Sequence, residues 1–168
     1  MKVFIKLAGP TSLDLIMYTH SFLTISIIMI ATVFISVLFF STEQRKGTVK
    51  ALMILALITT IFVFILVNIT GLLGYIDYRM AVPDSPKTII LGLSPFVHEV
   101  YFETMEYVSL LGPIWATLIT WLVWHYKEKI FTNVAIKSTI SVLVILALSY
   151  ALVIAYTGIV PTRIEAIH

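Results

Sequence analysis

The sequence predicts an all-α integral membrane protein: an up-down bundle of four transmembrane helices with a long outer loop between helices 2 and 3. Of its 168 residues, 60% are hydrophobic and 12% are charged, whereas a soluble domain carries about 25% charged residues. Four runs reach the ~20 mostly apolar residues that a spanning helix needs. None shows strand-like alternation, and a chain in lipid must satisfy its own backbone hydrogen bonds, so each run is expected to be helical.

The four helices are expected at about residues 14–40, 50–75, 95–128 and 134–160, within a single domain that covers residues 1–168. The first two are joined by a short basic stretch, and the last two by a short stretch after residue 127. Residues 76–93 form the long loop, which contains Pro83, Asp84 and Pro86.

The start of the third helix is predicted by Ser94 and Pro95, because serine caps helix N-termini and proline suits the first helical position. Up to residue 128 this helix would measure about 50 Å at 1.5 Å per residue. It is therefore longer than the hydrocarbon core, and its first turns are expected at the membrane interface. Gly112 and Pro113 are expected to kink it.

The charges predict how the chain is oriented. Basic residues lie close to the span ends in the two short connections: Arg45, Lys46, Lys50, Lys127 and Lys129. Basic residues favour the cytoplasmic side. We therefore expect a multi-pass protein of the cell membrane with both termini and the long loop outside the cytoplasm.

Composition also excludes several classes of function. The net charge of +2 and the lack of a basic run argue against a nucleic-acid partner, and with no cysteine the chain has no disulfide or thiolate site. No catalytic residue can be assigned, because the chain contains no phosphate-binding loop, metalloprotease motif or serine elbow. A non-catalytic subunit is favoured over a stand-alone enzyme. The expected partners are the lipid bilayer and either other membrane subunits or further copies of the chain.

A cluster of carboxylates lies at the start of the third helix. Glu99, Glu103 and Glu106 are spaced by four and three residues, which puts them on one helical face. They are expected to face water as an interfacial turn, to pair with Arg79 or Lys87, or to bind a metal ion or protons.

Two histidines are expected at the same end of the bundle. His20 and His98 lie near the starts of the first and third helices, which run in the same direction in an up-down bundle. Such a pair can be the axial ligands of a haem or join carboxylates around a metal. The alternative is two interfacial histidines bonded to backbone or water. The candidate metal ligands are His20, His98, Glu99, Glu103 and Glu106.

Residues 74–86 read Gly-Tyr-Ile-Asp-Tyr-Arg-Met-Ala-Val-Pro-Asp-Ser-Pro. This stretch resembles a loop of the haem A synthase family, in which a glycine and an arginine precede Cys-Pro-Asp-Trp-Pro and the next helix carries Glu-x-x-His. Here Val82 and Ser85 stand in place of the cysteine and tryptophan, and Glu106 in place of the histidine. The resemblance covers about 40 residues of helices 2 and 3 and implies a haem.

A second resemblance is to small four-helix proteins that assist cytochrome oxidase assembly. It rests on Phe96-Val-His98, on His125 and on Tyr156-Thr157-Gly158. Together the two resemblances imply a subunit or assembly protein of a respiratory or haem-related membrane complex, which binds haem or a metal ion at its outer face. His20 and His98 would then be ligands and Arg79 a propionate partner. The alternative function is a small oligomeric ion or proton transporter that uses the Glu99, Glu103 and Glu106 face.

Overall fold

The computed structural model of the chain describes residues 12–41, 46–79 and 85–165. All regular structure in these ranges is helical. Four helical stretches are long and apolar enough to cross a membrane: Leu15–Phe40, Lys46–Ile76, Val97–His125 and Val134–Thr157. The prediction of an all-helical chain with four long apolar helices is therefore confirmed.

The first and last long helices are continuous, and the second has three parts. The continuous ones are α1 (Ser12–Phe40) and α7 (Val134–Glu165). α2 (Lys46–Ile65) passes through the six-residue π-helix η1 (Leu66–Gly71) into α3 (Leu72–Tyr78). Short π-helical stretches are rare and frequently occur at functional sites, so η1 is a candidate part of such a site.

The third long stretch is also interrupted. It consists of η2 (Val97–Phe102), which is a second π-helix, α5 (Glu103–Ser109) and α6 (Leu111–His125). The break at Leu110 lies just before Pro113, whose ring lacks an N–H and clashes with the carbonyl four residues earlier. The break therefore occurs where the Gly112-Pro113 pair predicts a kink. A Cβ on Gly112 would lie 3.4 Å from Cγ1 of Val63, so the glycine lets α6 approach α2 closely.

The segment predicted as a loop contains a further helix. α4 (Pro86–Leu93) follows Ser85, whose hydroxyl oxygen accepts a hydrogen bond from the backbone N–H of Thr88 at 3.3 Å. This is the same serine-proline signal that predicts the helix start at Pro95. The expectation of a loop is therefore wrong for residues 86–93, while residues 80–84, with Pro83 and Asp84, lie outside the described part of the chain.

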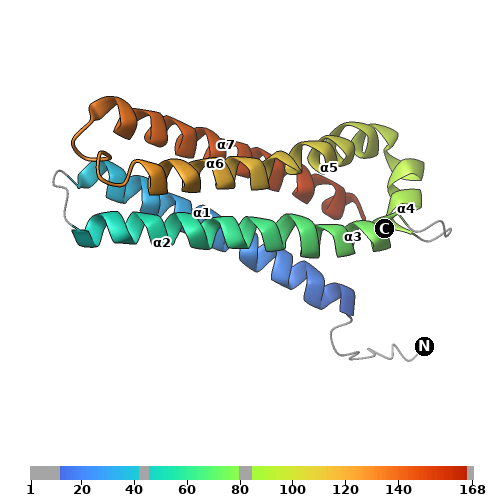
Figure 1. Ribbon diagram of the computed structural model, residues 1–168. Coiled ribbons are helices and arrows are strands. Elements are labelled where there is room, and N and C mark those ends of the chain that lie inside the picture. Colours follow the sequence, from blue (N-terminus) through green and yellow to red (C-terminus); the bar gives the residue numbers. More distant parts are fainter. Residues whose placement is uncertain (1–11, 42–45, 80–84, 166–168) are drawn as a thin grey trace.

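The long helices lie side by side (Figure 1). α2 packs against α1 and α6, and α7 packs against α1 and α6 in turn. Figure 1 shows the end of α1, the start of α2 and the α6–α7 connection at one end of the molecule. α3, α4 and the last turns of α7 lie at the other end, which we call the α4 end.

Each end has its own buried cluster. Near the α6–α7 connection the core includes Leu38, Leu52 and Val123, all 0% exposed. At the α4 end Tyr78, Ile90, Val97 and Phe102 form a second cluster. Large apolar side chains elsewhere point outward, for example Phe22 at 66% exposed, which suits a protein whose outer surface contacts lipid.

Candidate functional site

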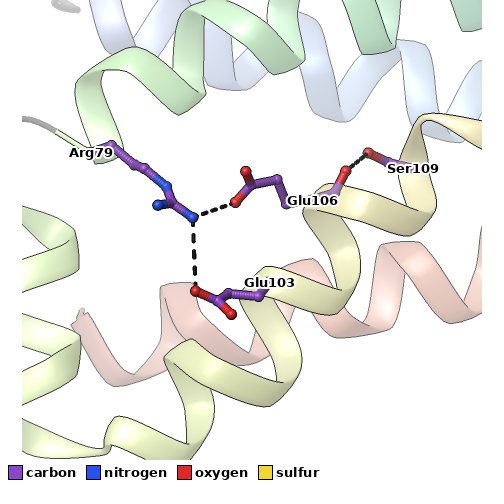
Figure 2. A network of polar contacts seen from close by, with 4 residues as sticks. All are labelled: Arg79, Glu103, Glu106 and Ser109. Carbon is purple, nitrogen blue, oxygen red and sulfur yellow. Dashed lines mark hydrogen bonds and ion pairs between the residues drawn. The ribbon is translucent and has the colours of Figure 1, made fainter.

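An ion-pair cluster joins α3 to α5 at the α4 end (Figure 2). Arg79 directly follows the last residue of α3, and its Nη2 donates to Oε2 of Glu106 at 2.7 Å. The same nitrogen lies 3.9 Å from Oε1 of Glu103. The guanidinium also stands over the ring of Tyr75, 5.1 Å from its centroid. Of the two cations that the sequence offers to the carboxylates, the structure pairs Arg79, whereas Lys87 forms no ion pair with the described residues.

Arg79 stays positively charged in this cluster. The hydrogen bond to Glu106 raises the pKa of Arg79 above its ordinary value, and the charges of Glu106 and Glu103 act in the same direction against the effect of burial. The side chains of Arg79 and Glu106 are only 28% and 20% exposed, while that of Glu103 is 41% exposed. The tight contact is therefore between Arg79 and Glu106, and Glu103 lies at its open side.

Glu99 does not join this cluster. The backbone N–H of Glu103 bonds to the carbonyl of His98, five residues back, as in a π-helix. The wider turn alters the α-helical spacing on which the predicted shared face rests. Glu99 is exposed, and within the described residues it has no ion pair. Glu99 therefore stands apart from the ion pair of Arg79.

His98 is buried inside the protein. It is 2% exposed, and its ring stands edge-on to those of Tyr78 and Phe102, with centroids 5.8 and 6.0 Å away. α7 and α4 pack against the π-helix that carries it. Its Nδ1 is buried and has no hydrogen-bond partner among the described residues. A buried polar atom of this kind is uncommon, since burial without a partner costs free energy.

His20 is held by the π-helix of the second span. Its Nδ1 lies 3.0 Å from Oγ1 of Thr70, a buried residue of η1. The Thr70 hydroxyl donates its one proton to the carbonyl of Leu66 at 2.9 Å. Its oxygen therefore acts as acceptor toward His20, whose Nδ1 must carry a proton. In the neutral imidazole this leaves Nε2 with a lone pair.

The predicted ligands are not gathered in one place. No hydrogen bond or ring contact joins His20 to His98. Where the chain is described, no group of three or more His, Asp or Glu side chains is arranged to hold a metal ion. The third histidine, His125, stacks on Trp121 at 5.0 Å between ring centroids and is exposed, which fits the aromatic belt of a membrane interface.

A polar contact between two of the candidate spans cannot be predicted from the sequence. Thr60 on α2 and Thr120 on α6 bond to each other at 2.7 Å. Each hydroxyl is also within hydrogen-bond distance of a carbonyl of the facing helix, Ala116 for Thr60 and Ala56 for Thr120. The two hydroxyl protons therefore serve two of these three contacts at a time. Paired threonines in apolar runs are the only sequence signal, and it does not identify partners that are 60 residues apart.

Near the break of the third stretch, Tyr150 on α7 donates its hydroxyl to the carbonyl of Val108. This bond uses a carbonyl close to the point where Pro113 interrupts the helix. Polar side chains in the spans thus connect α2 with α6 and α7 with α5.

Comparison with known proteins adds no assignment. No family model, no curated protein and no solved structure matches this chain.

Proposed function

We propose that this chain is a subunit or assembly protein of a respiratory or haem-related membrane complex, which crosses the cell membrane four times as an up-down bundle. Its long helices have the length and apolar surface of bilayer spans. The hydroxyls of Thr60, Thr120 and Tyr150 are engaged between helices. This structural use of polar groups supports a non-catalytic subunit rather than a stand-alone enzyme.

The observation that carries the cofactor part of the proposal is the hydrogen bond of His20. Histidines that bind metals almost always donate their other ring N–H to a nearby oxygen, which fixes the tautomer and the ring direction. The Thr70 oxygen has this role for His20, so Nε2 is suited to ligate a haem iron or another metal ion. A haem bound there would supply the redox chemistry of its iron.

Two other predicted roles fit the geometry less well. Arg79 does not suit a haem propionate, because its guanidinium already has Glu106 at 2.7 Å. Nδ1 of His98 has no partner among the described residues, but the ring is enclosed by those of Tyr78 and Phe102. We therefore propose His20 as the primary ligand, with the second ligand coming from a partner subunit or, after rearrangement, from His98.

Haem titration of the purified protein tests this proposal. Added haem should give a Soret band typical of histidine ligation, and His20→Ala should abolish it. Thr70→Val, which removes the oxygen that orients the ring, should weaken binding about 10–100-fold. His125→Ala is the matched control and should bind as the wild type does. Unchanged haem binding by His20→Ala would refute the proposed ligand. Loss of haem binding in His98→Ala would identify His98 as the second ligand.

The proposed orientation has its own test, which the absence of cysteine makes simple. Single cysteines at position 87, at the α4 end, and position 132, in the α6–α7 connection, are exposed to a membrane-impermeant maleimide in intact cells. With both termini outside the cytoplasm, Lys87→Cys should be labelled and Thr132→Cys should not. The reverse pattern would invert the proposed topology.

The alternative function, an oligomeric ion or proton transporter, gains no support from the geometry. Of the three glutamates that would form its path, Glu106 and Glu103 share the charge of Arg79, and Glu99 is turned to the surface.

A further inference from the structure

An open groove of about 220 Å³ lies between α6 and α7, at the end of the molecule opposite to His98. It is lined by residues that lie four apart in pairs: Leu122 on α6 with Tyr126 directly after its end, and Ala135 with Thr139 and Ile136 with Ile140 on α7. Residues four apart follow the helix axis. The groove therefore runs along the helices, which is the direction of a lipid acyl chain in a bilayer.

The shape of the groove depends on small side chains. Ala135 and Thr139 are exposed, whereas Ile140 is 1% exposed and forms the floor. Larger side chains at the two exposed positions would fill the space. The lining residues of α7 belong to one of the candidate spans, so an apolar occupant would come from the lipid side.

Two lysines lie within three residues of Tyr126, which lines the groove. The connection that follows Tyr126 folds back in turns: the N–H of Lys129 donates to the carbonyl of Tyr126 at 2.7 Å, and the N–H of Asn133 to that of Lys129 at 2.9 Å. Lys127 and Lys129 are exposed and form no ion pair with the described residues. Glu128 lies between them, so the turn keeps a positive balance.

We propose that this groove binds one acyl chain of an anionic phospholipid, with its phosphate held by Lys127 and Lys129. The apolar lining and the axial direction of the groove fit the lipid acyl chain, and the two lysines fit the negative charge of the headgroup. A basic residue near the headgroup region contributes attraction to anionic lipids, and this attraction falls off within a Debye length. The proposal is independent of a cofactor at His20.

Competition between two lipids tests this proposal. The protein is purified in detergent, mixed with equal amounts of phosphatidylglycerol and phosphatidylcholine, and analysed by native mass spectrometry. The anionic lipid should be retained in preference. Lys127→Gln should weaken its binding about 5-fold and the double variant with Lys129→Gln about 30-fold, since each lysine contributes about a factor of five. Lys87→Gln, which removes the same charge at the α4 end, should have no effect.

A second variant tests the groove itself. Ala135→Leu fills it and should remove binding of both lipids, while circular dichroism confirms that helix content is kept. If Ala135→Leu lowers the helix content, the lysine variants on the exposed turn decide the question. Equal binding of the two lipids, or unchanged selectivity in the double lysine variant, would overturn the proposal. A dimer that Ala135→Leu dissociates would also overturn it, because the occupant would then be a second copy of the chain.

Discussion

Removal of the contact between Arg79 and Glu106 should reveal how strongly the second and third spans are joined. The perturbation is a double-mutant cycle of Arg79→Gln, Glu106→Gln and the double variant. Arg79→Gln should destabilise more than Glu106→Gln. Without the arginine, Glu103 and Glu106 face each other on α5 with no cation, whereas Glu106→Gln leaves Arg79 beside Glu103 at 3.9 Å.

The geometry sets the magnitude. A hydrogen bond to a charged group contributes about 1.5–3 kcal/mol, and a fully exposed ion pair about 0.2–1 kcal/mol. With Arg79 28% and Glu106 20% exposed and 2.7 Å between the bonded atoms, we expect a coupling energy between these limits, about 1–2 kcal/mol. For Arg79 and Glu103, at 3.9 Å and with Glu103 41% exposed, we expect less than about 0.5 kcal/mol.

The assay is reversible unfolding in detergent micelles, followed by circular dichroism and tryptophan fluorescence. The free energies of unfolding of the four proteins in each cycle give the coupling energy directly. A matched cycle with Glu103→Gln is the control. Equal coupling for the two glutamates, or a value for Glu106 within error of zero, would refute the reasoning from distance and burial.

Three further changes test other contacts. In a double-mutant cycle of Thr60→Val and Thr120→Val, the free energies of unfolding should show a coupling of about 0.6–1.7 kcal/mol, the range for hydrogen bonds between transmembrane helices. Additive effects would mean that the 2.7 Å contact does not form. Gly112→Leu should cost about 1–3 kcal/mol through overpacking against Val63, as measured by unfolding, while a neutral result would contradict the close approach of α6 to α2. Ser85→Ala should remove the cap of α4 at a cost of about 1 kcal/mol, seen as faster hydrogen exchange in residues 86–93, and unchanged exchange there would argue against the cap.

Much of the fold follows from local sequence. The start of α7 at Val134 and the break before Pro113 agree with the sequence, because chain hydrophobicity and proline geometry act within a few residues. The missed helix α4 carries the same kind of signal in Ser85 and Pro86. The sequence does not reveal this helix, because the nearby Pro83 and Asp84 favour a loop and eight helical residues are too few to show as an apolar run.

The candidate site could be predicted from the sequence less completely than the fold. The sequence leaves Arg79 and Lys87 as equal partners for the glutamates. The choice follows from α3, which continues to Tyr78 and thereby brings Arg79 beside α5. The π-helical turn of η2 could not be predicted from residue spacing, and Glu99, which lies in it, takes no part in the ion pairs of Arg79.

Four helices of membrane-spanning length follow from local sequence alone, because the need to satisfy backbone hydrogen bonds in lipid applies to each apolar run separately. Only the tertiary structure decided that Thr70 orients His20, that Tyr78 and Phe102 enclose His98 and that Glu106 pairs with Arg79. Apart from the contact between His98 and Phe102, which both lie in η2, these contacts join different segments of the chain. Their short-range forces act only after the helices have packed.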